Sequence, residues 1–284
     1  MKKFLTLLLA AFVAVSALSF ASCSSGAQGA KDLDNVKSKG KIIVGMECAY
    51  APYNWAQTTA SDYTVEVKSG MYADGYDVQV AKKIAEYLKV DLEIRPIEWD
   101  GLIPALTGNN IDLVIAGMSP TAERRASIDF SNTYYDSNLV MVIRKDGAYT
   151  KATKIADFAG AKITGQLNTF HYKVIDQIAD VKKQTALPDF AALTSALKSG
   201  AVDGYVCEKP GAISAVTAYS EFTYIEFEGI NGFTCDPEES SIAVGLRKGS
   251  SLTASVNEAI GEITKTQREE MMMAAIARQP VSEE

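Results

Sequence analysis

Residues 115–124 read Ile-Ala-Gly-Met-Ser-Pro-Thr-Ala-Glu-Arg, and this stretch decides the fold expected for the chain. Its first residues continue an apolar run that predicts a buried strand ending at Gly117. The Ser-Pro-Thr that follows consists of turn and cap residues, so we expect a short helix with Thr121 as its N-cap. This order places Arg124 just beyond the carboxyl end of a strand, where open α/β sheets bind their ligands.

A guanidinium at this position can bind a small carboxylate through two parallel hydrogen bonds. Free backbone N–H groups and the small hydroxyls beside it would add further donors. The alternative is that Arg124 forms an ordinary surface ion pair, which contributes little. This stretch alone does not favour one role over the other.

The N-terminus carries the pattern of an export signal. Two lysines precede an almost uncharged apolar run at residues 4–20, which is short for a membrane-spanning helix. Small residues then precede Cys23, as in bacterial lipoprotein signals, whose cleavage leaves the cysteine first and acylated. We therefore expect a signal peptide over residues 1–22, lipidation at Cys23 and a flexible tether over 23–31. An ordinary secretory signal cleaved nearby is the alternative.

Removal of the signal peptide leaves 262 residues with 26 basic and 35 acidic side chains, a net charge of −9. This sign argues against nucleic acid as a partner and favours a soluble extracytoplasmic domain of one large or two medium-sized units. Beside Cys23, the remaining cysteines are odd in number and lack metal-ligand spacing: Cys48, Cys207 and Cys235. We expect no disulfide framework, although one unassigned pair stays open. His171 is the single histidine, which excludes a multi-histidine metal site; neither metal nor cofactor is expected.

The order of the expected elements indicates an α/β fold. Strands are expected at residues 41–46, 92–97 and 111–116, with a helix that begins near Asp77 and a short helix after Trp99. Alternation of this kind is typical of a parallel sheet covered by helices.

Two apolar strands of similar character, at residues 138–144 and 241–247, enclose a smaller second unit of the same plan. Within it we expect a helix from about residue 170 to 179, capped by Asn168 or Thr169. Two helical segments are expected to close the chain.

Seven segments, in order along nearly all of residues 40–265, resemble one known family: GKIIVGMECAYAPYNW, DGYDVQVAKKIAEYL, EWDGLIPAL, IDLVIAGMSPTAERR, IDFSNTYY, VDGYVCEKP and SSIAVGLRKGS. The family is that of the periplasmic or lipoprotein solute-binding proteins that deliver polar amino acids to ABC importers. The resemblance implies a two-lobed, type II periplasmic-binding-protein-like fold of the α/β class. Each lobe would be a mostly parallel sheet flanked by helices, with two hinge strands joining the lobes and the ligand between them.

The resemblance also implies domain boundaries. Lobe one would comprise residues 32–140 plus 241–284, and lobe two residues 145–236. The hinge crossovers would fall at 140–144 and 241–245.

Several ligand-binding roles follow from the resemblance alone. Arg124 matches the arginine that pairs with the ligand α-carboxylate, and Gly117 and Ser119 match positions that contact its carboxylate or ammonium group. In the second lobe, Asn168 and Thr169 match a helix N-terminus offered to the same carboxylate, an anion site with a physical basis. Simple helix capping is their alternative role.

Four further matches concern the rest of the ligand. Glu208 matches an aspartate that receives the α-ammonium group, although its side chain is one methylene longer. Tyr50 and Trp99 match the aromatic residues that sandwich the ligand side chain, with a core role as the alternative. Glu47 matches the position that meets the distal cation of a basic ligand, with a solvated loop carboxylate as the alternative.

The function implied is an extracytoplasmic binding lipoprotein, anchored to the membrane through Cys23 and acting as a monomer without catalysis. It would capture a polar L-amino acid by closure of its lobes and deliver it to the permease of an ABC transporter. Glu47, Glu208 and the net charge favour arginine, lysine or histidine, and glutamine or another neutral polar amino acid is the alternative. A dehydratase-like enzyme on the same fold is a further alternative, with Glu208 and His171 as its candidate acid or base groups. A role as a sensor or adhesin is a third.

Overall fold

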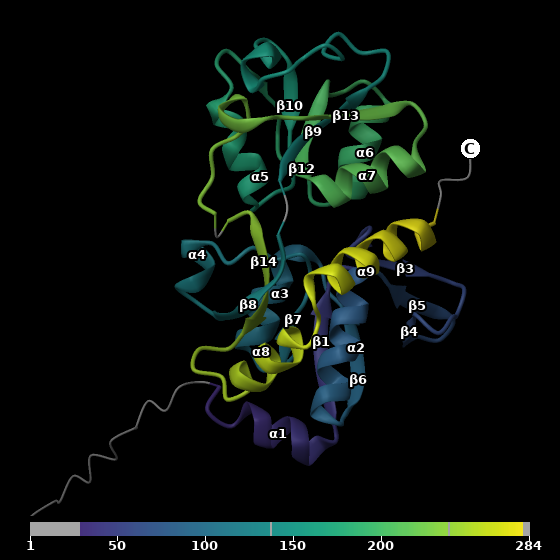
Figure 1. Ribbon diagram of the computed structural model, residues 1–284, viewed down its shortest axis with the longest axis vertical. Helices are drawn as coiled ribbons and strands as arrows, with labels where there is room; N and C mark the ends of the chain where they lie inside the picture. Colours follow the sequence, from purple (N-terminus) through teal and green to yellow (C-terminus); the bar gives the residue numbers. More distant parts are fainter. Residues whose placement is uncertain (1–28, 137, 238, 281–284) are drawn as a thin grey trace, which may run out of the picture.

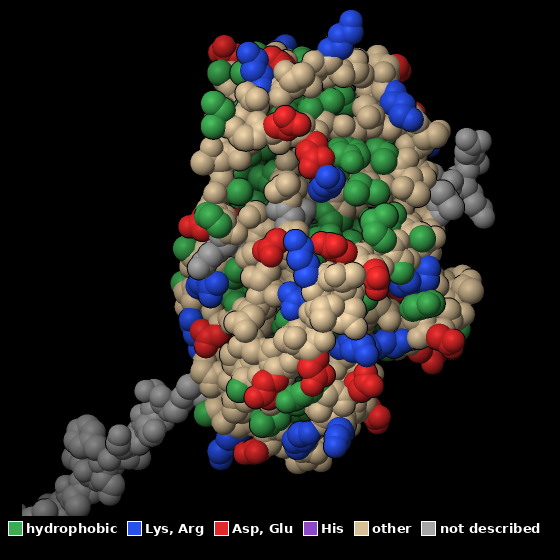
Figure 2. Space-filling view, in the orientation of Figure 1, with side chains coloured by type: hydrophobic (Ala, Val, Ile, Leu, Met, Phe, Trp, Pro, Cys, Tyr) green, Lys and Arg blue, Asp and Glu red, His purple; other side chains and the backbone are tan. Residues whose placement is uncertain are grey.

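The computed structural model describes residues 29–136, 138–237 and 239–280, which form two α/β lobes stacked one above the other (Figure 1). The predicted signal peptide, the lipidation site at Cys23 and most of the predicted tether lie outside the described residues. Within the described ranges, no helix has the length and apolar character needed to cross a membrane. On the face shown in Figure 2, acidic and basic side chains are interspersed.

The first lobe is built on a five-stranded sheet with the order β6-β1-β7-β14-β8. Strand β1 pairs in parallel with β6 and β7, whereas β14 runs antiparallel to β7 and β8. The strands are β1 (Lys41–Met46), β6 (Asp91–Pro96), β7 (Leu113–Val114), β8 (Asp129–Asp136) and β14 (Ser241–Leu246). The helical segments of this lobe are α1 (Asp32–Lys39), α2 (Tyr76–Leu88), η1 (Trp99–Gly101), α3 (Leu102–Thr107), α4 (Ala122–Arg125) and α8 (Thr253–Gly261). The predicted strand 41–46 is confirmed, and its β-branched residues are buried as a central strand requires.

A small antiparallel sheet extends the first lobe. Its order is β2-β3-β5-β4, from β2 (Ala49–Tyr50), β3 (Asn54–Gln57), β4 (Val65–Lys68) and β5 (Met71–Asp74). Because β2 follows β1 after only two residues, this sheet places Tyr50 close to the carboxyl end of β1.

The second lobe has a sheet of the same size, with the order β11-β10-β12-β9-β13. Strand β10 is parallel to β11 and β12, and β9 is antiparallel to β12 and β13. The strands are β9 (Leu139–Arg144), β10 (Lys162–Thr164), β11 (Lys182–Lys183), β12 (Gly204–Glu208) and β13 (Phe222–Glu226). The helical segments are η2 (Ile155–Phe158), α5 (Phe170–Lys173), η3 (Val174–Gln177), α6 (Phe190–Lys198), α7 (Lys209–Ala218) and η4 (Gly229–Asn231). Both sheets are therefore mixed rather than mostly parallel, since β9 and β14 run against their neighbours.

The predicted crossovers lie inside strands and not in the connections. Residues 140–144 belong to β9 of the second sheet and residues 241–245 to β14 of the first sheet. The chain changes lobe just before each of them, between Asp136 and Leu139 and within residues 227–240. Both strands are apolar and almost fully buried. Such residues are more stable inside a sheet than in a connection exposed to solvent. The second lobe thus begins at β9, several residues before the predicted boundary.

The C-terminal helix α9 (Lys265–Arg278) contacts both lobes, because it packs against α2 of the first and α7 of the second (Figure 1). Arg278 forms an ion pair with Asp74 of the first lobe at 3.1 Å. The Gln279 amide donates to the backbone carbonyl of Ser214 on α7 at 3.0 Å, and the Ser214 hydroxyl donates back to the Gln279 amide oxygen. The end of the chain therefore links the lobes in addition to the two backbone crossings.

Candidate functional site

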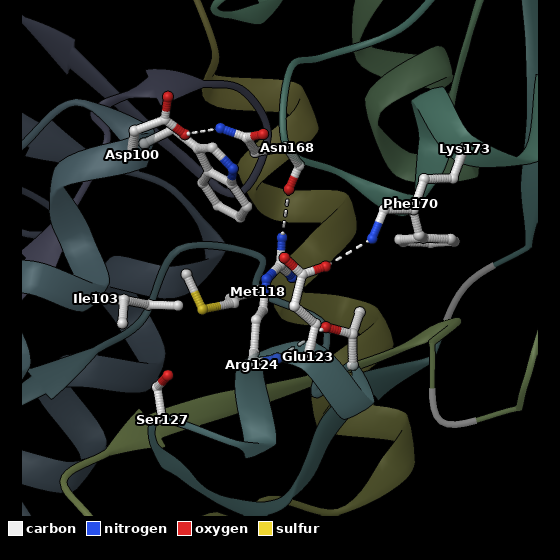
Figure 3. Close-up of a pocket in the computed structure, with 11 residues that line it drawn as sticks. Asp100, Ile103, Met118, Glu123, Arg124, Ser127, Asn168, Phe170 and Lys173 are labelled. Carbon is white, nitrogen blue, oxygen red and sulfur yellow. Dashed lines mark hydrogen bonds and ion pairs between the residues drawn. The ribbon is translucent and has the colours of Figure 1, made fainter.

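Arg124 of α4 lies where the two lobes meet (Figure 3). The backbone N–H of Arg124 donates to the Thr121 hydroxyl at 3.3 Å, which confirms the predicted N-cap. The guanidinium donates to the carbonyl oxygens of Ser119 at 2.9 Å and of Asn168, across the cleft, at 3.1 Å. It lies over the ring of Trp99, 5.0 Å from the ring centroid. Within the described residues Arg124 forms no ion pair, and its removal from water lowers its pKa to about 10, so it stays charged at neutral pH.

The turn before α4 brings the backbone close to an aromatic ring. Gly117 has φ +62° in the left-handed region, where side chains other than glycine are strained. A Cβ at this position would lie 3.0 Å from a ring carbon of Tyr50. Strand β7 already ends at Val114, before the predicted end at Gly117, so the glycine serves the turn that follows the strand and makes room for Tyr50.

A buried carboxylate that the sequence did not single out as functional supports this turn. Asp77 accepts hydrogen bonds from the Tyr134 hydroxyl at 2.7 Å and the Asn54 amide at 2.8 Å. The N–H of Gly117 in turn donates to the Tyr134 hydroxyl at 3.3 Å. Burial raises the pKa of Asp77 to about 6, although these hydrogen bonds oppose the shift. The network fixes the backbone that leads to Arg124.

Glu208, at the end of β12, lines the narrow part of the cleft from the second lobe, and its side chain is almost fully buried. Its Oε2 accepts a hydrogen bond from the Tyr50 hydroxyl, and its Oε1 lies 2.8 Å from Nε2 of His171. Burial alone would raise the pKa of Glu208, but the charge and contact of His171, with the Tyr50 hydroxyl, outweigh it and hold the pKa below its ordinary value. The Tyr50 ring also stacks on Phe190 of the second lobe at 4.1 Å between centroids. Tyr50 is thus both a core residue and part of the cleft.

The helix predicted over residues 170–179 is shorter than expected: α5 spans four residues and continues as the 3₁₀ segment η3. Thr169 is its N-cap, but the Thr169 hydroxyl donates to the carbonyl of Gln166 at 2.7 Å and caps no helical N–H. Asn168 has φ +56° and donates from its side-chain amide to Asp100 across the cleft at 2.8 Å. A single α-helical turn has only a weak macrodipole. The predicted binding of an anion by this helix N-terminus is therefore reduced to hydrogen bonds from individual backbone groups.

Glu47, the residue directly after β1, is buried and is not the solvated loop carboxylate of the alternative prediction. The Gln166 amide of the second lobe donates to its two oxygens at 3.2 and 3.4 Å. Burial raises the pKa of Glu47 to about 7, the Gln166 hydrogen bond opposes this, and three nearby carboxylates raise it further: Asp189, Glu98 and Asp100. No cation pairs with Glu47 in the part of the chain that the structure describes.

The predicted residues of both lobes come together around one narrow cavity of about 10 Å³. It is lined by seven of them, Tyr50, Trp99, Gly117, Ser119, Arg124, Thr169 and Glu208, and by Gln166, Phe170 and His171. A wider cavity of about 350 Å³ is drawn in Figure 3. It adjoins the narrow one, because Trp99, Arg124 and Phe170 line both. Asn168 lines this second cavity, and Glu47 reaches the site through Gln166.

Four residues of the site escaped sequence analysis in these roles: Gln166, Phe170 and His171, which line the cavity, and Phe190, which stacks on Tyr50. The only local signal was the uniqueness of the histidine, which identified no partner. Their partners are distant in sequence: Glu47 directly after β1, Tyr50 in β2 and Glu208 at the end of β12.

Comparison with known proteins identifies the class that this fold and site define. Residues 42–274 match the model of the bacterial extracellular solute-binding proteins, family 3, and the chain belongs to this family.

The arginine-binding extracellular protein ArtP of Bacillus subtilis (strain 168) is 27% identical over 276 residues, which cover 93% of each chain. The L-cystine-binding protein TcyA of the same organism is 28% identical, covering 90% of this chain and 91% of its own. Among solved structures, the amino acid ABC transporter substrate-binding protein AbpA of Streptococcus pneumoniae, bound to L-arginine, aligns with a TM-score of 0.73 at 26% identity. It covers 86% of this chain and 98% of its own. The ancestral amino acid-binding protein AncCDT-1, a precursor of cyclohexadienyl dehydratase, aligns with a TM-score of 0.69 at 26% identity, over 86% and 99% of the two chains. The expected two-lobed α/β fold is confirmed.

Proposed function

We propose that this protein captures a polar L-amino acid between its lobes, a basic one in preference, and delivers it to the permease of an ABC transporter. One observation carries the proposal: Arg124 of the first lobe and Glu208 of the second line the same cavity. Arg124 can bind an α-carboxylate, and the ionised Glu208 can accept from an α-ammonium group. A free amino acid carries both groups on one carbon and can engage both lobes at once.

The preference for a basic side chain rests on Glu47. Its carboxylate is buried beside three further acids, and each of them disfavours its ionisation. A cationic side chain would relieve this repulsion, while a neutral one would leave Glu47 protonated or unpaired. Tyr50 and Trp99 supply aromatic faces for the aliphatic part of such a side chain. The similarity to an arginine-binding relative and to an arginine-bound structure agrees with this preference.

Lobe closure supplies the mechanism of capture. Contacts between the lobes surround the site: Arg124 with Asn168, Asp100 with Asn168, Glu47 with Gln166, and Glu123 with Lys173. The ligand would favour this closed arrangement because only then do both of its charged ends find partners, which is the differential affinity that a conformational shift requires.

The proposal includes anchoring through a lipid on Cys23, a monomeric state and the absence of catalysis. Two acyl chains or more hold a protein at a membrane stably, so the released amino acid would be close to the permease. A dehydratase would need a free acid or base aimed at its substrate. Glu208 and His171 instead contact each other.

Isothermal titration of the mature protein with arginine, lysine, histidine, glutamine and cystine tests the proposal. We expect one ligand per chain and the strongest binding among the three basic amino acids. Binding of glutamine without binding of any basic amino acid would overturn the preference, and no binding of any amino acid would overturn the function. Mass spectrometry of the incubated ligand should show it unchanged, and a new product would support an enzyme.

A further inference from the structure

The ring of Tyr50 fills the space between the lobes beside Glu208. It is about 3% exposed and stacks on Phe190 of the second lobe, with 4.1 Å between centroids and 14° between the ring planes. On the side of the first lobe, a Cβ at Gly117 would lie 3.0 Å from a ring carbon. On the side of the second lobe, a Cβ at Gly211 would lie 3.5 Å from another ring carbon. Tyr50 is therefore enclosed by both lobes.

The Tyr50 hydroxyl contacts the group that a ligand ammonium would need. It donates a hydrogen bond to Oε2 of Glu208, across the cleft. Burial and the charge of Glu208 raise the pKa of Tyr50 well above its ordinary value, so the hydroxyl keeps its proton at neutral pH and remains a donor. The O–H of a phenol and the N–H of an ammonium group both donate to a carboxylate oxygen. The hydroxyl therefore makes the contact that is proposed for the ligand.

The remaining space is too small for the hydroxyl and an ammonium group together. The narrow cavity beside Glu208 has a volume of about 10 Å³. A cavity needs about 10–15 Å³ to hold a single water molecule, so this one cannot hold an amino acid. A ligand that spans Arg124 and Glu208 therefore requires the ring of Tyr50 to move.

A third cavity offers a place for the displaced ring. Its volume is about 160 Å³, and it is lined by residues that adjoin Tyr50 in space or in sequence: Ala49, Ala51, Phe190 and Gly211. A shift toward this cavity takes the hydroxyl away from Glu208 and leaves the ring beside the ligand site. The lobes can then stay in contact while the ligand is bound.

We propose that Tyr50 is an internal competitor of the ligand: its hydroxyl occupies Oε2 of Glu208, and the α-ammonium group of the ligand displaces it. This inference rests on the proposed function, since it takes Glu208 as the ammonium acceptor. The hydrogen bond between Tyr50 and Glu208 joins the two lobes, and every ligand that uses Glu208 has to break it. Tyr50 therefore lowers the affinity for amino acids and favours contact between the lobes of the ligand-free protein.

The test compares the wild type with Tyr50→Phe, which keeps the ring and removes only the hydroxyl. Calorimetric titration with arginine should give a Kd lower by about tenfold or more for Tyr50→Phe, because the variant has no hydrogen bond to a charged group to give up. The matched ligand is δ-guanidinovaleric acid, which is arginine without its α-ammonium group. It should bind Tyr50→Phe no more tightly than the wild type, since it has no ammonium group to place on Glu208.

Tyr53→Phe is the matched control variant. The ring of Tyr53 lies 4.8 Å from that of Tyr50 between centroids, and its buried hydroxyl has no hydrogen-bond partner in the described residues. Arginine should bind Tyr53→Phe with the Kd of the wild type. Small-angle X-ray scattering of the ligand-free proteins should give a larger radius of gyration for Tyr50→Phe than for the wild type and Tyr53→Phe. Saturation with arginine should remove this difference.

Equal or weaker binding of arginine by Tyr50→Phe overturns the inference, and so does a gain in affinity that δ-guanidinovaleric acid shares. Equal radii of gyration of the ligand-free proteins overturn it as well. A crystal structure of the wild type with arginine needs no variant, and a Tyr50 hydroxyl that stays on Glu208 in that complex has the same consequence. If arginine, lysine and histidine bind none of these proteins, the proposed function has failed instead, and the scattering of the ligand-free proteins still tests the contact between Tyr50 and Glu208.

Discussion

Two arginines follow strands of the first sheet, and their surroundings are opposite. Arg247, after β14, is buried and lies 2.8 Å from Asp32 and 3.3 Å from Asp112. It also donates to two backbone carbonyl groups. Arg124, after β7, is only partly buried and has carbonyl partners but, within the described ranges, no carboxylate. The same side chain is neutralised in one place and left with its charge available in the other.

The difference separates a structural cluster from a binding site. Arg247 ties α1, through Asp32, to the loop before β7, through Asp112, so its guanidinium charge is fully matched and is not available to a ligand. In the cleft, Arg124 and Glu47 each hold a charge or a potential charge without an ionic partner in the described chain. A protein that binds a zwitterion with a cationic side chain needs unmatched groups of this kind, because matched ones would have to be separated first.

Substitution of Arg247 should have the largest effect. Arg247→Ala leaves two buried carboxylates without a cation, and breaking a buried pair in this way costs about 3–5 kcal/mol. We expect this loss in the free energy of unfolding measured with urea, with arginine affinity retained in the folded fraction. The milder Arg247→Lys should lose less stability in the same assay. Wild-type stability in both variants would contradict the structural role.

Arg124→Ala should show the reverse pattern. Truncation of one partner of a buried charge pair costs about 2–5 kcal/mol of binding, so Kd should rise by roughly 30-fold or more. The free energy of unfolding of the ligand-free protein should stay near that of the wild type, because no carboxylate loses its partner. Calorimetry and urea unfolding on the same preparations measure both quantities. Lost stability with intact binding would show that the two arginines had been assigned the wrong way round.

Glu47→Gln sharpens the contrast through pH. The pKa of Glu47 is raised from 4.5 to about 7 by burial, so the folded protein favours the protonated form. The stability that protonation of Glu47 contributes to the fold is fully present below about pH 4.5 and is lost as pH rises through about 7. Each pKa unit corresponds to about 1.4 kcal/mol, so the ligand-free wild type should lose up to about 3 kcal/mol between pH 4.5 and 8. Glu47→Gln should lack this part of the decrease in stability, while the part that comes from Asp77 remains in both proteins. Urea unfolding at several pH values measures the difference, and stability curves that run parallel in the two proteins would contradict the prediction.

How far the sequence predicts this molecule depends on the distance over which each feature is specified. The Arg124 half of the site could be predicted because a strand end, a cap residue and the guanidinium lie within ten residues. The two-lobed fold followed from segments whose order is unusual, although each segment is short. The crossovers were misplaced since an apolar strand looks the same in a hinge as in the middle of a sheet.

The other half of the site depends on packing between segments far apart in sequence. The Asn168-Thr169 pair correctly indicated where a helix begins, but the tightening into η3 after Lys173 depends on the surrounding lobe and has no sequence signal of its own. The contact of His171 with Glu208 requires α5 to lie against β12, and that of Gln166 with Glu47 requires the lobes to meet.

The smallest effect is expected from an ion pair that links the lobes outside the cavity's charged core. Lys173 and Glu123 lie 2.7 Å apart, and both side chains are well exposed, at 64% and 79%. Exposed pairs contribute about 0–1 kcal/mol and are screened by salt. Lys173→Gln should therefore change the arginine Kd by less than about threefold, and the change should vanish at 0.5 M salt. A larger effect that persists in salt would mean that lobe closure depends on exposed charges as well as on the unmatched charges inside the cleft. The contrast between Arg247 and Arg124 would then not be enough to explain binding.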